Sequence, residues 1–166
     1  SNRGKITNKY LEKILELWGD NKIDHLDYTF EPKPIQQPSI PIWVGGNSKL
    51  AINRAVKYGD AWHPTRLTPK DVNDKLPYLY KLLSKYGKDK KSFSISLKRN
   101  LNFTDIELPN IHFKKNISSL SGTANEIKKD IEYCKEIGID QLTFDLSTNN
   151  IKTATEIIKY FMHINK

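Results

Sequence analysis

The chain alternates between short apolar stretches and longer segments in which apolar side chains recur every three or four residues. The first pattern is typical of buried strands and the second of amphipathic helices. Strands are predicted at 42–44, 61–63, 93–102 and 140–146, and the helices that follow them at 49–58, 68–86, 123–137 and 151–163. Such alternation favours a parallel sheet with right-handed crossovers. Four units form either a small doubly wound sheet or half of an eight-stranded barrel, and the spacing alone does not choose.

The first forty residues differ from this regular part. Residues 7–18 are predicted to form a helix that begins at Thr7 and ends at Gly19. The apolar positions on one face of this helix are Leu11, Ile14, Leu15 and Trp18. Residues 20–40 contain three of the eight prolines and show no sustained period, so we expect a surface excursion with one short strand at Tyr28–Phe30.

Local signals mark two of the helix starts. Thr68 followed by Pro69 is typical of a cap and the first helical residue. Thr123 and Glu126 stand at the spacing of a capping box. Pro77 lies inside the helix predicted at 68–86, where it indicates a kink or a break. Residues 104–121 show neither period and are predicted to be irregular.

Composition is that of one globular domain covering residues 1–166, with 37% hydrophobic and 28% charged residues. No apolar run reaches the roughly 18 residues of a membrane span, and the first ten residues do not resemble a signal peptide. The single cysteine, Cys134, falls on the apolar face of a helix and suits a reducing compartment. We therefore expect a cytoplasmic protein without a membrane partner.

The net charge of +8 raises the question of nucleic-acid binding, because lysine and arginine neutralise phosphates. The 27 basic side chains are scattered over nearly all predicted helices among 19 acidic ones. No basic strip interleaved with aromatic residues, of the kind that stacks bases, is present in the sequence. A solvated, lysine-rich surface explains the charge, and no nucleic-acid partner is expected.

Two glycines, an amide and a hydroxyl separate the strand at 42–44 from the helix that follows. Gly45 and Gly46 allow the backbone to come close to a ligand, while Asn47 and Ser48 add polar groups. The start of the next helix offers unpaired N–H groups and a partial positive charge, which together favour an anion. The loop therefore predicts a phosphate site at the carboxyl edge of the sheet. The alternative is a tight turn that needs glycine for its dihedral angles.

Trp62 and His63 end the next strand and are expected near the same edge. Tryptophan can pack against a flat aromatic ring, and histidine can donate a hydrogen bond to such a ring or transfer a proton near neutral pH. The alternative is that Trp62 packs in the core and His63 merely ends the strand. Asp145, near the end of the last strand, is either catalytic or a polar strand-end residue. No metal site is expected, because metal-ligand spacing is absent from the other histidines, His25, His112 and His163.

Two motifs stand at a characteristic distance from one another: "PIWVGGNS" at 41–48 and "GDAWHP" at 59–64. Further matching positions are Arg3, Gly4, Thr7, Leu11, Trp18, Pro32, Pro34, Gln37, Ala51, Arg54, Ala55, Gly122, Thr123, Glu126 and Gly138. In this order the chain resembles the luciferase-like monooxygenase superfamily, and within it the deazaflavin-dependent oxidoreductases that use coenzyme F420. The likeness covers nearly the whole chain.

This resemblance implies an α/β fold whose four strand–helix repeats form about half of a TIM (β/α)8 barrel. It implies an oxidoreductase that uses FMN or coenzyme F420 and transfers a hydride to or from a small organic substrate. The cofactor-binding residues that it implies are Val44, Gly45, Gly46, Asn47, Ser48 and Trp62. His63, which would border the cofactor ring, is the catalytic candidate.

The likeness corresponds to the carboxyl-terminal half of the family barrel, so this half alone is expected to be inactive. A half barrel leaves two strand edges and an open apolar face, which normally must be covered. We therefore expect a homo-oligomer or pairing with a missing amino-terminal segment. The alternative function is a non-catalytic module that binds a phosphorylated ligand or serves only in assembly.

Overall fold

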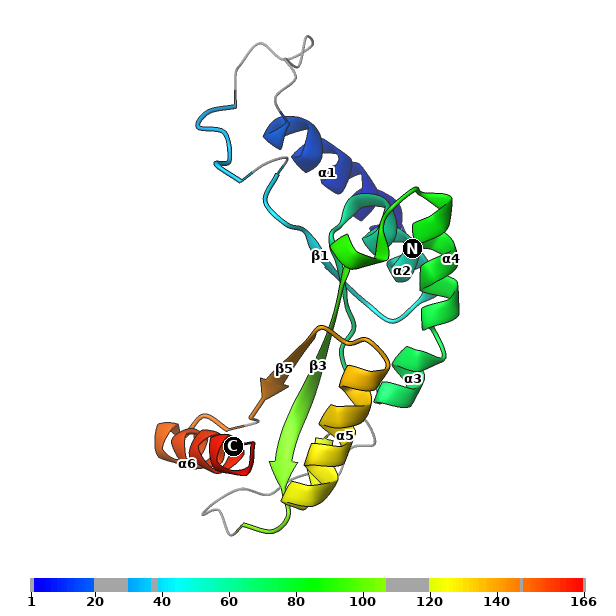
Figure 1. Ribbon diagram of the computed structural model, residues 1–166. Helices are drawn as coiled ribbons and strands as arrows, with labels where there is room; N and C mark the ends of the chain where they lie inside the picture. Colours follow the sequence, from blue (N-terminus) through cyan, green and yellow to red (C-terminus); the bar gives the residue numbers. More distant parts are fainter. Residues whose placement is uncertain (1, 20–29, 37–38, 107–119, 147, 166) are drawn as a thin grey trace.

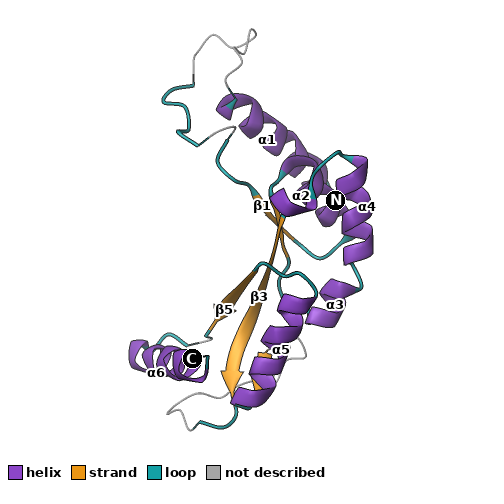
Figure 2. Cartoon of the chain, viewed as in Figure 1, coloured by secondary structure: helices purple, strands orange, loops and turns teal. Residues whose placement is uncertain are grey.

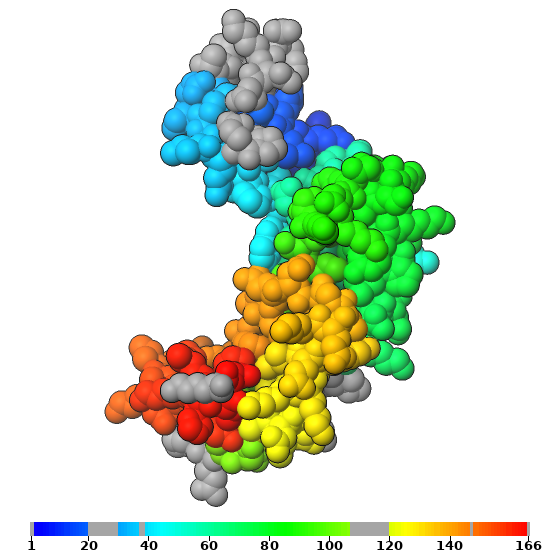
Figure 3. All heavy atoms as spheres, viewed as in Figure 1, coloured from blue at the N-terminus to red at the C-terminus, as the bar shows by residue number. Residues whose placement is uncertain are grey.

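The computed structural model describes residues 2–19, 30–36, 39–106, 120–146 and 148–165, and it confirms the four predicted strand–helix units (Figures 1 and 2). In chain order the elements are α1 (Arg3–Trp18), β1 (Trp43–Gly45), α2 (Lys49–Tyr58), β2 (Ala61–His63), α3 (Pro69–Asn73), α4 (Leu76–Lys85), the 3-10 turn η1 (Lys90–Ser92), β3 (Ser94–Phe103), β4 (Leu120–Gly122), α5 (Ala124–Glu136), β5 (Gln141–Asp145) and α6 (Ile151–Ile164). The molecule forms an arc that is hollowed between the region of β1 and the end carrying α6 (Figure 3). No helix in the described part of the chain is long and apolar enough to cross a membrane.

All strand pairs among the described residues are parallel, and β3 is the strand that pairs with three others. It pairs with β2 at its start, with β5 along Ser96–Asn100, and with β4 along Leu101–Phe103. β1 joins the sheet through β2. β4 was not predicted, because its three residues are too short to show a period within 104–121. The expected α/β class with parallel strand–helix units is confirmed.

The helices pack on one face of the sheet, as in the outer ring of a barrel and unlike a doubly wound sheet, which is covered on both faces. Val44, Trp62 and Leu97 meet α2, α4 and α5 in one apolar cluster. A second cluster joins Leu101 of β3 to Ile157 of α6. Half of a (β/α)8 barrel therefore describes the arrangement better than the doubly wound alternative.

The opposite face of the sheet is polar, which corrects the expectation of an open apolar face. Side chains alternate along a strand, so Ile95, Leu97 and Leu101 of β3 enter the core beneath the helices. The residues of β3 between them face the open side, and they are Ser96, Lys98, Asn100 and Asn102. Association with a second copy or a further segment stays a prediction that now depends on the strand edges. Among the described strands, β1 pairs only with β2, and β5 only with β3.

Three element boundaries differ from the predictions. α1 starts at Arg3 rather than after Thr7, whose hydroxyl donates to the Arg3 carbonyl inside the helix. The helix predicted at 68–86 is broken into α3 and α4, and Pro77 lies in the first turn of α4. The break was one of two alternatives, and it places proline where its missing N–H costs nothing. The strand expected at Tyr28–Phe30 lies outside the described residues except for Phe30, which is not in a strand.

A buried ion pair fastens α5 to β3. Arg99 is only 4% exposed, and its guanidinium donates to the carboxylate of Asp130 on α5. The Cys134 thiol lies one turn further along α5, with its Sγ atom 3.8 Å from Asp130 Oδ1. Burial, helped by the Asp130 charge, raises the pKa of this thiol to about 12. Cys134 is therefore a packing residue, as its helix spacing predicted.

Replacing Asp130 tests this attachment. Asp130→Ala leaves a buried guanidinium without that carboxylate, so the free energy of unfolding should fall by about 3 kcal/mol. Glu132→Ala changes an exposed carboxylate of the same helix and should alter it by less than about 0.5 kcal/mol. Urea unfolding followed by circular dichroism measures both values. Equal losses in the two variants would show that the pair does not stabilise the fold.

Candidate functional site

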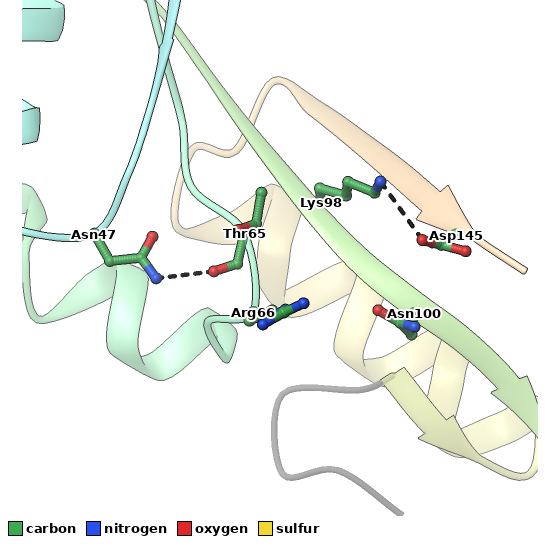
Figure 4. Close-up of a pocket in the computed structure, with 6 residues that line it drawn as sticks. All are labelled: Asn47, Thr65, Arg66, Lys98, Asn100 and Asp145. Atoms are coloured by element: carbon green, nitrogen blue, oxygen red, sulfur yellow. Dashed lines mark hydrogen bonds and ion pairs between the residues drawn. The ribbon is translucent and has the colours of Figure 1, made fainter. Parts of the chain in front are cut away.

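A polar cavity of about 640 Å³ lies where the ends of the strands meet (Figure 4). Its lining residues are Asn47, Thr65, Arg66, Lys98, Asn100 and Asp145. They come from the loops after β1 and β2, from the open face of β3, and from the end of β5. Four neighbouring strands thus contribute to one site at the edge where ligands of parallel α/β folds bind.

The loop between β1 and α2 contributes Asn47 to this site. The Asn47 amide donates from Nδ2 to the Thr65 carbonyl at 2.9 Å, which ties the loop to the one after β2 (Figure 4). Ser48 caps α2, because its hydroxyl accepts from the Ala51 N–H at 3.1 Å. Gly46 has a φ of +107°, and a Cβ there would lie 2.9 Å from the Ala51 Cβ. The turn-geometry interpretation therefore holds for Gly46, while Asn47, two residues before α2, lines the cavity.

The charges around the cavity suit an anionic group. Arg66 is exposed and has a φ of +58°, which turns the chain so that this residue lines the cavity. Lys98 pairs with Asp145 across the sheet at 3.5 Å (Figure 4). Two cations and one carboxylate leave the cavity lining with a net positive charge, beside the positive end of α2. A buried acceptor, Asn47 Oδ1, also lacks a hydrogen-bond partner in the described part of the chain.

The structure places Trp62 and His63 on opposite faces of the sheet. Trp62 is 0% exposed in the helix-side core, and its indole N–H donates to the Gly46 carbonyl at 2.8 Å. The prediction that its side chain borders a ring is wrong, because alternation turns it inward. Trp62 instead supports the glycine loop from beneath. An aromatic residue that does lie on the open face is Trp43, which is 46% exposed and has its ring centroid 5.9 Å from that of His63.

His63 lies half-buried on the open face. Its Nδ1 atom is 2.9 Å from the Ser96 hydroxyl. Burial is the main cause that lowers the pKa of the His63 imidazole below 6.5, and the Lys98 charge lowers it further. At pH 7 the ring is therefore neutral. A neutral imidazole can accept or donate a hydrogen bond, depending on which nitrogen carries the hydrogen.

The sequence model of the luciferase-like monooxygenase family matches residues 1–105. The chain belongs to the luciferase-like monooxygenase family. A comparison with proteins of curated function found no match. The matched region contains Asn47, Thr65, Arg66, Lys98 and Asn100, so every lining residue of the cavity except Asp145 lies within the family match.

Solved structures show the same fold at low sequence identity. An F420-dependent secondary alcohol dehydrogenase, solved with an F420–acetone adduct, has a TM-score of 0.72 and 17% identity, over 99% of this chain and 62% of its own. EDTA monooxygenase from Chelativorans sp. BNC1 has a TM-score of 0.67 and 11% identity, over 98% and 59%. The coenzyme F420 dependent tetrahydromethanopterin reductase from Methanopyrus kandleri has a TM-score of 0.60 and 12% identity, over 93% of this chain and 60% of its own. This luciferase-like chain thus spans about 60% of the length of these structures.

Several lining residues of this luciferase-like chain were missed from the sequence. Thr65 and Arg66 follow "GDAWHP" directly, and Lys98 and Asn100 belong to β3. The signal for the last two was present, since every second residue from Ser94 to Asn102 is polar in an otherwise buried strand. Arg66 had no such signal, because its position depends on a left-handed backbone. Asp145 was named as a candidate and does line the cavity.

The predicted cofactor-binding residues fall into two groups. Gly46, Asn47 and Ser48 form the loop after β1, and of these Asn47 lines the cavity. Gly45 is the last residue of β1, whereas Val44 is buried on the helix side and can offer only its backbone. No cluster of three or more metal-ligating side chains occurs among the described residues. His163 lies at the end of α6, and His25 and His112 lie outside the described part of the chain.

Substitution of Gly46 tests the loop geometry. Gly46→Ala forces a side chain into a strained backbone and against Ala51, so the free energy of unfolding should fall by about 2 kcal/mol. Gly87→Ala is the matched control, because its φ of +64° lies in the left-handed well and nothing lies within 4 Å. It should cost about 1 kcal/mol. Chemical denaturation measures the free energy of unfolding of both variants. A smaller loss of stability in Gly46→Ala than in Gly87→Ala would contradict the described turn.

Titration of His63 tests the electrostatics of the open face. Its pKa should lie below 6.5 and rise in Lys98→Met, since the neighbouring positive charge is removed. Because the unfolded chain takes up this proton first, His63 favours the folded state above pH 6.5, and that contribution is lost as the pH falls below it. Proton NMR follows the titration, with His63→Gln to assign the signal. An unchanged pKa in Lys98→Met would rule out the Lys98 contribution.

Proposed function

We propose that this chain forms the cofactor-holding part of an oxidoreductase that uses coenzyme F420 or FMN. One observation carries the proposal: Asn47, which follows the two glycines before α2, lines a cavity that also contains Arg66 and Lys98. Family membership supports it. Two structures with the same fold are described as F420-dependent, a secondary alcohol dehydrogenase and a tetrahydromethanopterin reductase. Both candidate cofactors carry phosphate, which is the group that such a cavity favours.

The residues of the cavity fit a phosphate by their chemistry. The first N–H groups of α2 and the backbone of Gly45 and Gly46 would donate to its oxygens. The Arg66 guanidinium would add a charge-assisted hydrogen bond. Lys98 would contribute positive charge while it stays anchored by Asp145. Ser48 acts through the helix it caps, because its hydroxyl already accepts from the backbone.

The cofactor, when bound, supplies hydride transfer at its ring. The chain would supply orientation and a place for a proton. His63 is neutral at pH 7 and faces the open side of the sheet, and Trp43 beside it offers a flat apolar surface. A small organic substrate is the proposed reaction partner. Because the chain spans about 60% of the length of the related structures, we assign it cofactor binding rather than complete turnover. We also propose a cytoplasmic location, since the single cysteine suits a reducing compartment.

Cofactor titration of the purified chain tests this proposal. Fluorescence should show saturable binding of either FMN or coenzyme F420. Arg66→Gln removes the guanidinium charge and its charge-assisted hydrogen bond and shortens the side chain, so the dissociation constant should rise at least about tenfold. Lys91→Met removes a charge from η1, away from the cavity lining, and should leave the constant unchanged.

Each result has a defined meaning. Equal weakening in Arg66→Gln and Lys91→Met would indicate attraction by net charge alone and would contradict a built phosphate site. Absence of binding for both cofactors would reject the proposed function for this chain. Tight binding of an unrelated phosphate ester, in preference to either cofactor, would favour the non-catalytic binding module instead.

A further inference from the structure

A row of hydrogen-bonded side chains crosses the open face of the sheet from β2 to β5. His63 Nδ1 lies 2.9 Å from Ser96 Oγ, and Ser96 Oγ lies 3.3 Å from Gln141 Oε1. The register explains the row, because Ser96 is paired with Gln141 and lies one residue beyond the partner of Trp62. Trp43 packs next to the His63 ring with an interplanar angle of 43°. Three strands thus meet at one buried hydroxyl.

Counting hydrogens along this row decides the state of the imidazole. Ser96 is 0% exposed, so its hydroxyl must find its partners inside the protein. A hydroxyl carries one hydrogen, and Gln141 Oε1 can only accept, so that hydrogen goes to Gln141. Ser96 Oγ is then an acceptor toward His63. The hydrogen between them must therefore belong to His63 Nδ1.

We propose that Ser96 and Gln141 act as positioning residues that hold His63 as the Nδ1–H tautomer, so that its Nε2 atom is a hydrogen-bond acceptor for a ligand on the open face. No hydrogen bond to Nε2 is present within the described residues. The ligand class that fits bears a hydroxyl or N–H group at this point. The use of Nε2 in the site depends on the proposed function, whereas the tautomer itself does not.

The surroundings favour the neutral acceptor over the charged imidazolium. Lys98 of β3 is the charged group that acts on His63, with Asp145 of β5 as its partner. From β1 the neighbour is the uncharged ring of Trp43. A ligand carboxylate or carbonyl would offer Nε2 no hydrogen. The arrangement therefore discriminates in favour of donors, such as an alcohol, over acceptors such as a ketone.

Nitrogen-15 NMR of the imidazole, on the full chain without any cofactor at pH 8, tests this assignment. His63 Nδ1 should resonate as a protonated nitrogen and Nε2 as an unprotonated one. Gln141→Glu offers only acceptor oxygens, whichever way the side chain turns, and should keep this pattern. Gln141→Leu removes the acceptor, which frees the Ser96 hydrogen for Nδ1, so the pattern should invert to the Nε2–H tautomer.

Gln141 is exposed, so both variants should fold, and Thr143→Val on the same strand is the control that should change nothing. Inversion in Gln141→Leu alone supports the proposal. An Nε2–H tautomer in the unaltered chain, or an unchanged pattern in Gln141→Leu, would overturn it. Failure of the cofactor titration would leave these spectra unaffected, so the two proposals fail separately.

Discussion

The two-residue period of β3 is the constraint on which the rest of the structure depends. Three strands pair directly with this one, so its alternation sets the inward and outward positions of the whole sheet. Its odd-numbered residues build the core with the helices, and its even-numbered residues build the open polar face. A shift of one residue in register would place Lys98 in the apolar core and Leu97 in the cavity. The fold and the site are therefore specified together by one strand.

Trp62 was predicted to line the site and lies in the core, whereas Trp43, which was not named as a candidate, lies on the open face. This difference shows which parts of the structure could be predicted from the sequence. The four strand–helix units followed from period alone, and Cys134 was placed correctly for the same reason. The residues of the site were predicted only in part, because a position near the end of a strand does not determine on which face of the sheet the side chain lies. Counting the alternation through "PIWVGG" would have put Trp43 and Gly45 together on the open face, with Val44 opposite. Arg66 could not be predicted in this way, since a loop residue with a left-handed backbone is not part of a periodic pattern of apolar and polar residues.

The turn and phosphate interpretations of the glycine loop are compatible once the contacts are known. Gly46 is required by its backbone angle, Ser48 by the helix start, and Asn47 by the neighbouring loop. The Ser48 contact uses the Ala51 N–H, so the N–H groups of Lys49 and Leu50, the first two residues of α2, are the ones left for a ligand. Trp62 completes this support from the core, because its indole N–H satisfies the Gly46 carbonyl. A preorganised loop loses little conformational freedom when a ligand binds, which favours affinity.

The polar open face also limits what can cover it. The interior of a (β/α)8 barrel is packed mainly with branched apolar side chains. Here the facing positions carry His63, Ser96 and the Lys98–Asp145 pair. Burial of such a pair under apolar side chains would cost several kcal/mol per charge unless further hydrogen bonds compensated it. Any segment that closes this face must therefore bring polar groups of its own or leave a solvated space, and a solvated space lined by these residues is what a ligand site requires.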